Sequence, residues 1–222
     1  MIKRLIAVAA LCSTASAFAS TNLLVDGSFE SAVLPTGTYQ YYEGTSLYGW
    51  ASSTGVDDAI EIRNDVVGTA QDGTYFAELD SRHNSSMSQS FATVAGQTYS
   101  LSFWYSNRAQ SDQYNSVFAG GVVPVDSQGL TFNVGAGDVA VPTVSTANTT
   151  ADNQWHQVTT IFVATGSSTT LSFAATGTSD SWGSSLDNIS VSSAVPEPAS
   201  GALLVSGVLV LAGLSRRRNR GQ

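Results

Sequence analysis

Three arginines and one tryptophan are the residues of this sequence best suited to bind a ligand, and they stand in a strongly acidic surrounding. Arg63, Arg82 and Arg108 are the only basic residues between positions 20 and 194, against 16 acidic ones, which leaves a net charge of −13. A guanidinium offers several donors in one plane, and an aromatic face packs against the C–H face of a sugar ring. We therefore predict a glycan-binding site made of Trp104, Arg108, Arg63 and Arg82. The alternative is that the arginines only pair with neighbouring carboxylates, which contributes little free energy on a surface.

The acidic residues give only a weak signal for catalysis. Glu78 and Asp80 lie two residues apart in a predicted strand and so point to the same side, which suits a metal or hydroxyl ligand as well as an acid and a base. Among 16 acidic residues such a pair arises by chance. His83 and His156 have no recognisable nucleophile partner, and the motif Gly-x-Ser-x-Gly is absent. Positions 20–194 contain no lysine, which excludes Schiff-base chemistry there. We predict that the protein is not an enzyme.

Composition narrows the classes of partner. The chain has 222 residues, a net charge of −8 and a pI of about 4.4, which argues against general nucleic-acid binding because that requires a basic face. A single cysteine excludes a disulfide scaffold and a zinc site built from several cysteines. An acidic surface repels anionic polymers. Neutral glycans, divalent cations or basic partners therefore fit better.

The elements that must position these residues are strands. Between positions 20 and 194, short alternating segments are separated by Gly, Asn, Asp and Ser, which predicts an all-β fold of the β-sandwich type. The predicted strands are Ala59–Arg63, Thr74–Asp80, Ser86–Thr93, Gln97–Ser106, Leu130–Val134, Trp155–Ala164, Thr169–Ala175 and Ser185–Ser192. Alternation places Leu101 and Phe103 on one face and Trp104 on the other. Val94–Gln97 predicts a hairpin turn in which Gly96 takes a positive φ. The segment Val117–Thr150 stays unassigned.

Several short motifs occur in a characteristic order along this core. They are residues 22–30 with Gly27-Ser28-Phe29-Glu30, Gly49-Trp50, residues 72–80, Ser88–Phe91, residues 96–103, and Leu186-Asp187-Asn188-Ile189 near the end. In that order they resemble the galactose-binding-like jelly rolls. They are similar to bacterial choice-of-anchor domains and, more distantly, to carbohydrate-binding modules. The resemblance implies a jelly-roll β-sandwich. It also implies that Glu30 and Asp187 lie side by side on adjacent terminal strands and hold a structural calcium. The alternative is that both carboxylates bind turn backbone or face water.

The first 19 residues differ from the core. Lys3 and Arg4 precede an apolar stretch from Leu5 to Cys12, and the segment ends in Ala17-Phe18-Ala19. This arrangement is typical of a secretory signal peptide that a signal peptidase removes. We therefore assign residues 1–19 to a signal peptide and residues 20–194 to the β-sandwich domain.

The last part of the chain, residues 195–220, is equally distinct. It contains Pro196, Glu197 and Pro198, an apolar run from Gly201 to Leu214, and a basic tail with Arg216, Arg217 and Arg218. These three parts, in this order, resemble the PEP-CTERM sorting signal of Gram-negative bacteria. The resemblance implies transient membrane insertion, with the arginines on the cytoplasmic side, and cleavage near Pro-Glu-Pro by an exosortase. It also implies a link to exopolysaccharide and biofilm. The alternative is a simple C-terminal membrane anchor.

The sequence thus predicts a protein that is exported through the inner membrane and works at the cell surface or in the extracellular matrix. Its predicted function is noncatalytic binding of polysaccharide in the cell envelope or biofilm matrix. The alternative function is that of a structural matrix protein or adhesin that binds other proteins and no sugar.

Overall fold

The computed structural model describes residues 21–43, 46–53, 55, 58–135, 139–141 and 146–194. The predicted signal peptide and the predicted sorting signal, with Pro196, Glu197, Pro198, Arg216, Arg217 and Arg218, lie outside the described residues. Among the residues that are described, no helix has the length and apolar character needed to span a membrane.

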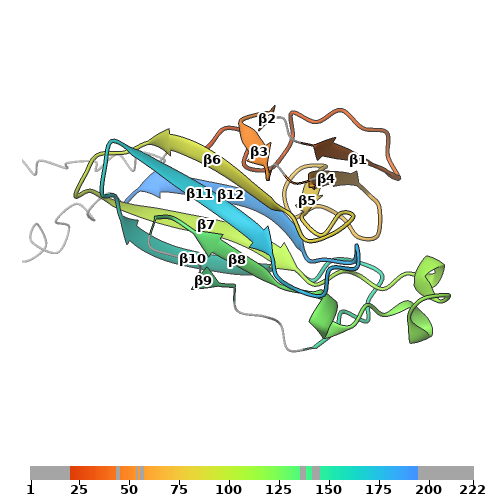
Figure 1. Ribbon diagram of the computed structural model, residues 1–222. Helices are drawn as coiled ribbons and strands as arrows, with labels where there is room; N and C mark the ends of the chain where they lie inside the picture. The colour runs from red at the N-terminus through yellow and green to blue at the C-terminus, as the bar shows by residue number, and fades with distance from the viewer. Residues whose placement is uncertain are drawn as a thin grey trace, which may run out of the picture.

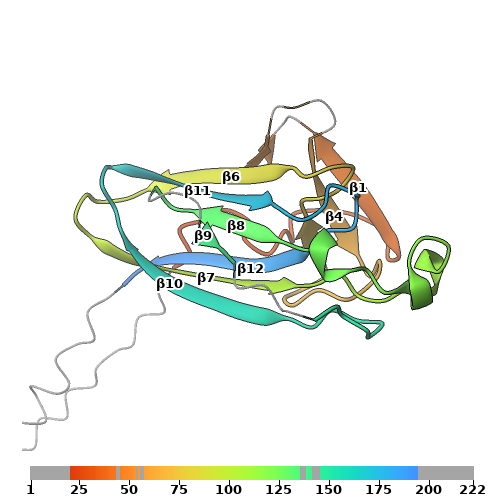
Figure 2. The same ribbon diagram turned by 60° about the horizontal axis from the view of Figure 1, so that its bottom comes forward.

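Two antiparallel sheets pack face to face, as the two layers of Figure 2 show. In the described part of the chain each sheet has six strands. The first sheet has the order β1 (Thr38–Glu43), β4 (Ala59–Asn64), β5 (Phe76–Glu78), β12 (Ser185–Ser193), β7 (Thr98–Ser106), β10 (His156–Val163). The second has the order β2 (Ser46–Leu47), β3 (Trp50–Ser52), β6 (Ser86–Ala92), β11 (Ser168–Ala175), β8 (Leu130–Asn133), β9 (Val139–Ala140). This architecture confirms the predicted all-β jelly-roll sandwich.

All eight predicted strands are present, with ends within two residues of the prediction. The sequence missed β1, β2, β3 and β9. β1 is an edge strand whose residues are half-buried or exposed without alternation, and the other three have only two or three residues, so none shows a period of two.

The turn at Val94–Gln97 is present, but it does not close a hairpin. Gly96 has a φ of 80°, and the amide of Gln97 donates to the carbonyl of Val94 at 3.0 Å. The strands that it joins, β6 and β7, belong to different sheets. The local turn was therefore predicted correctly and the pairing of its flanking strands was not, because a turn signal does not specify which sheet the next strand enters.

The core fills the space between the sheets. Leu101 and Phe103 of β7 are fully buried, and Phe103 meets Phe173 of β11 with ring centroids 5.0 Å apart. Trp104 points to the opposite face of β7 and is half-buried, as the alternation predicts. Trp50 is fully buried, and its indole N–H donates to the carbonyl of Asp26 at 3.1 Å.

The outer face of the first sheet, which points away from the second sheet, is covered at one end. Every residue of β4 is buried, although only Ile60 and Ile62 belong to the core between the sheets. Glu61 and Arg63 point to the outer face. They lie beside the 3₁₀ turn η1 (Asp112–Tyr114) and the turn before β12, which cover them. The loop that begins with η1 also carries η2 (Ala119–Gly121) and η3 (Val125–Ser127) and is seen in green at the right of Figure 1. The unassigned segment Val117–Thr150 supports this cover through Gln128, whose side chain binds the backbone of Arg108 and Trp182.

Candidate functional site

A pocket of about 250 Å³ opens between the outer face of the first sheet and the loops that cover it. Four aromatic side chains and two arginines contribute to its wall, namely Tyr39, Tyr41, Tyr114, Trp182, Arg63 and Arg108. We call it the aromatic–arginine pocket. Cross-strand register builds it, because Tyr39 pairs with Arg63 and Tyr41 with Glu61 on the adjacent strands β1 and β4.

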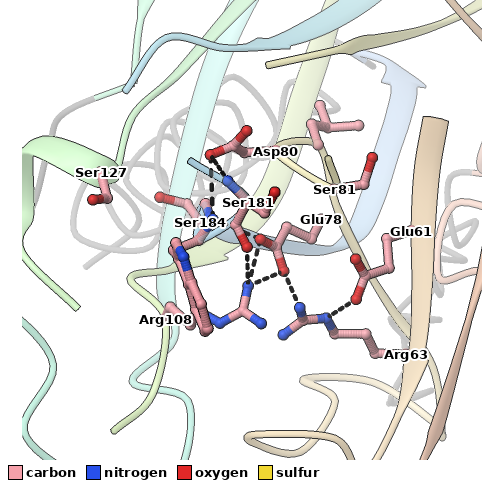
Figure 3. Close-up of polar contacts among 12 residues, drawn as sticks. Glu61, Arg63, Glu78, Asp80, Ser81, Arg108, Ser127, Ser181 and Ser184 are labelled. Carbon is pink, nitrogen blue, oxygen red and sulfur yellow. Dashed lines mark hydrogen bonds and ion pairs between the residues drawn. The ribbon is translucent and has the colours of Figure 1, made fainter. Parts of the chain in front are cut away.

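The two arginines are held by one buried carboxylate. Arg108 Nη1 lies 2.6 and 2.7 Å from the two oxygens of Glu78, and Arg63 Nη2 lies 2.5 Å from Glu78 Oε2. Arg63 Nε also donates to Glu61 Oε1 at 2.7 Å. Figure 3 shows the two guanidinium groups beside each other on the same side of Glu78. Burial raises the pKa of Glu78, against the opposing effect of Arg108 and Arg63, so its carboxylate depends on both cations to stay charged.

Arg63 keeps one guanidinium nitrogen without an acceptor among the described residues. Its exposed fraction is 2%, and Nη1 is buried with no hydrogen-bond partner within the described ranges. Burial by itself lowers the pKa of Arg63, but Glu78 and then Glu61 outweigh it and raise the pKa above its ordinary value. The group is therefore charged at any working pH. A buried cationic N–H without an acceptor is costly. Because Arg63 lines the pocket, a ligand oxygen that reached Nη1 would lower this cost.

Arg108 also organises the aromatic wall. Its guanidinium carbon lies 5.2 Å from the ring centre of Tyr114 and 5.0 Å from that of Trp182, within cation–π range. Tyr114 and Trp182 meet edge to face at 4.3 Å. Gln128 connects the two loops, since its side chain accepts from the amide of Arg108 at 3.0 Å and donates to the carbonyl of Trp182 at 2.8 Å.

Asp80 fixes the turn that carries Trp182. Its Oδ2 accepts from the amides of Asp180, Ser181 and Trp182 at 3.2, 3.1 and 3.3 Å. The next residue, Gly183, passes so close that a Cβ there would lie 2.7 Å from the Cβ of Asp80. The amide of Gly183 donates to Glu78 Oε1 at 2.7 Å. Glu78 and Asp80, predicted to point to one side of a strand, thus serve as buried acceptors that position the pocket.

The structure brings together the three arginines that the sequence singled out. Arg63 and Arg108 line the pocket. Arg82 lies beside it, with its guanidinium carbon 4.6 Å from the ring centre of Tyr41 and an ion pair to Glu43. The alternative, pairing with carboxylates, also holds for each arginine. In Arg63 and Arg108 these pairs are buried and not on the surface.

Trp104 lies apart from this pocket. In the register it sits on the outer face beside Asp187 of β12, three strands from Arg63. At about 4.8 Å per strand the separation is roughly 14 Å. The tryptophan that does line the pocket is Trp182, which sequence analysis assigned no role in binding. Its position just before the last strand, in Asp180-Ser181-Trp182-Gly183, is the signal that a turn there could expose it.

Glu30 and Asp187 hold the same loop by its backbone. Glu30 Oε1 accepts from the amides of Thr74 and Tyr75 at 2.7 and 2.9 Å. Asp187 Oδ2 accepts from the amides of Gln71 and Asp72 at 2.8 and 3.0 Å. These contacts fit the alternative in which both carboxylates bind turn backbone. Calcium takes about six to eight oxygens, and among the described residues no three His, Cys, Asp or Glu side chains form a metal-binding group. Structural calcium stays a prediction.

Asp187 should make stability depend on pH. Burial raises its pKa to about 7, against the lowering effect of the amides of Asp72, Asn188 and Gln71. An unfolded aspartate titrates near about 3.9, so between about pH 4 and 7 the folded state holds a proton that the unfolded state lacks. The free energy of unfolding therefore falls as pH rises through this window, by up to about 1.4 kcal/mol per pH unit.

Asp187→Asn should flatten this dependence, as measured by urea unfolding at several pH values with chelator present. An unchanged slope would contradict the assignment to Asp187. Repeating the series with added calcium tests the ion, because a bound calcium would raise the midpoint in the wild type and not in Asp187→Asn.

Several solved structures are similar to this chain at low sequence identity. A Stig cyclase from Fischerella sp. TAU, solved in complex with a pyrrolidinylidene-indole, has a TM-score of 0.51 and 16% identity, covering 81% of this chain and 100% of that one. The carbohydrate-binding module TmCBM61, solved with β-1,4-galactotriose, has a TM-score of 0.46 and 19% identity over 78% of this chain and 99% of that one. A family 16 carbohydrate-binding module has a TM-score of 0.46 and 16% identity, covering 77% and 99% of the two chains.

No curated protein matches the sequence. A family model does match it, over residues 22–192, which span both sheets and every residue of the aromatic–arginine pocket. The chain therefore belongs to the family described as "Protein of unknown function (DUF642)".

Proposed function

We propose that this protein binds carbohydrate, without transforming it, in the aromatic–arginine pocket. The observation that carries the proposal is the buried side chain of Arg63 in the wall of a pocket that four aromatic side chains line. Its Nη1 has no acceptor in the part of the chain that the structure describes. A sugar supplies both complements, because its hydroxyl and ring oxygens accept hydrogen bonds and its C–H faces pack on aromatic rings.

The charges around the pocket favour an uncharged ligand. Arg63 and Arg108 are balanced by Glu61 and Glu78, and Arg82 is paired with Glu43. The cluster is therefore close to neutral and offers donors without a net positive field. The rival function, binding of proteins without sugar, requires a broad contact surface, whereas the feature found here is a small concave site.

Trp182→Ala is expected to weaken polysaccharide binding at least tenfold, because it removes the largest aromatic face of the pocket. The purified domain would be fractionated on immobilised polysaccharides, and affinity for the retained ones measured by calorimetry. Tyr39→Ala is a second variant, since Tyr39 is 51% exposed and its loss should not affect folding.

Trp104→Ala is the matched comparison, because the same side chain is removed from the outer face of β7 at a distance from the pocket. It should bind like the wild type. Loss of binding with Trp104→Ala and retention with Trp182→Ala would move the site to the position predicted from sequence. Retention in Trp182→Ala, Tyr39→Ala and Trp104→Ala alike would overturn the proposal.

We also propose, from the terminal segments of the sequence, that signal peptidase and exosortase process the chain and that it acts at the cell surface or in the biofilm matrix. The intact mass of the protein recovered from the outside of producing cells tests this. A mature chain should lack residues 1–19 and the arginines after position 215. Recovery of the full-length chain from the cytosol would contradict it.

A further inference from the structure

A second, larger cavity adjoins the aromatic–arginine pocket. It has a volume of about 850 Å³, and its wall includes Asp65, Thr69, Gln110, Asp112, Gln113 and Asp152. We call it the outer cavity. Gln113 lines both cavities. Two segments of the chain contribute to both cavities. In the first, Val66 lines the aromatic–arginine pocket, here also called the inner pocket, and Asp65 lines the outer cavity; in the second, Tyr114 lines the inner pocket and its neighbour Gln113 lines the outer cavity.

The inner pocket alone is small for a ligand site. Its 250 Å³ lies below the range of about 300–1,000 Å³ that is usual for small-molecule sites. The outer cavity lies next to it along the surface, because one side chain, Gln113, belongs to both walls. If the ligand is a chain of sugar units, one unit would contact Trp182 and Arg63, and the following units would lie in the outer cavity.

The chemistry of the outer cavity suits hydroxyl groups. Its carboxylates and amides accept and donate hydrogen bonds in one plane, which is how polar side chains bind sugar hydroxyls. Asp65, Asp112 and Asp152 all line it, and no basic residue does so in the part of the chain that the structure describes. A carboxylated or sulfated sugar unit would be repelled here, while a neutral unit would not.

We infer that the ligand is a neutral oligosaccharide or polysaccharide chain, with one sugar unit in the aromatic–arginine pocket and the adjoining units in the outer cavity. This inference rests on the proposed function, since it is the unpartnered Arg63 donor and the aromatic wall that mark the inner pocket as a ligand site. Beyond the proposed function, it states that the site selects its ligand by two properties, the length of the sugar chain and the absence of charge.

Chain length is tested by calorimetry with neutral β-1,4-linked glucose, galactose and mannose oligomers of one to four units. At least one series should bind with an affinity that rises tenfold or more from the single sugar to the longer oligomers. Gln113→Ala, which changes an exposed side chain shared by both cavities, should remove most of this gain. Single-sugar binding that depends on Trp182 but does not improve with length would overturn the inference and leave the proposed function standing.

Charge is tested with galacturonate oligomers of the same lengths and the double variant Asp65→Asn/Asp112→Asn. Asparagine preserves shape and tolerates the positive φ of 53° at Asp65. The wild type should bind galacturonates at least tenfold more weakly than the neutral series, and the variant should narrow that gap severalfold. Asp72→Asn, outside both cavities, is the control and should not change it.

Equal binding of charged and neutral oligomers by the wild type would overturn the selection for charge. Absence of binding to every probe, with the protein folded, would overturn the proposed function together with this inference.

Discussion

Glu78→Ala is expected to lower the free energy of unfolding by about 3–5 kcal/mol, because it leaves two buried cations without their shared acceptor. The exposed fractions are 0% for Glu78, 2% for Arg63 and 6% for Arg108. Without Glu78 the two guanidinium groups would face each other in a site from which water is largely excluded. A typical domain is stable by only about 5–15 kcal/mol, so this single change would remove a large part of the total. Urea unfolding of the purified domain measures it.

Glu43→Ala is the matched control. It also removes a glutamate that pairs with an arginine, but the side chains of Glu43 and Arg82 are 46% and 41% exposed. Such a pair contributes about 0–1 kcal/mol. Equal losses in the two variants would mean that water reaches Glu78 in solution and that the arginine pair is not buried. If Glu78→Ala does not fold, Glu78→Gln, which retains one acceptor oxygen, should give an intermediate loss.

The strands were predictable wherever one face is buried and the other is not. In β7, Leu101 and Phe103 alternate with Ser102 and Trp104, and the period of two follows directly from the pleat. β1 carries no such pattern because it is an edge strand with both faces partly open. The sequence therefore indicated the sandwich but not the strand that brings Tyr39 and Tyr41 to the aromatic–arginine pocket.

The arginines could be singled out as candidate site residues for a reason of charge. Three cations among 16 acidic residues stand out by composition alone. Their convergence could not be predicted, because it depends on Glu78, which is 30 positions from Arg108 in sequence and lies across from Glu61 in the sheet. The register between paired strands decides which carboxylate lies beside which guanidinium. That register is set when the strands pair in the folded protein, so it cannot be read from either strand alone.

The choice between Trp104 and Trp182 shows the same limit. Trp104 was preferred because strand alternation gives its direction, and the structure confirms that direction. Trp182 stands in a turn, where no periodicity applies. Its position is fixed by the amides that bind Asp80, about a hundred residues earlier in the chain. Contacts of that range are absent from any local pattern. The sequence therefore pointed to a tryptophan on the outer face of the first sheet but not to the one that lines the pocket.

Asp80→Ala is expected to reduce both stability and sugar binding, although Asp80 is fully buried and does not line the pocket. The change leaves the amides of residues 180–182 without their acceptor and opens a void beside Gly183. Hydrogen bonds to a charged group contribute about 1.5–3 kcal/mol each. Since the three share one oxygen at 3.1–3.3 Å, a total loss of about 3 kcal/mol in the free energy of unfolding is expected.

The effect on binding follows from the same contacts, because Trp182 is the last of the three amides that Asp80 fixes. Affinity for a retained polysaccharide should fall about tenfold under conditions where the variant is still folded. Asp72→Ala is the control, since its side chain accepts from the exposed Ser28 hydroxyl at 2.9 Å and lies outside the pocket. It should change neither the affinity nor the free energy of unfolding by much.

Asp80→Asn separates the two effects, because it restores the shape of the side chain and one acceptor oxygen. It should recover binding more fully than stability. Undiminished binding by folded Asp80→Ala would show that the turn keeps Trp182 in place without Asp80.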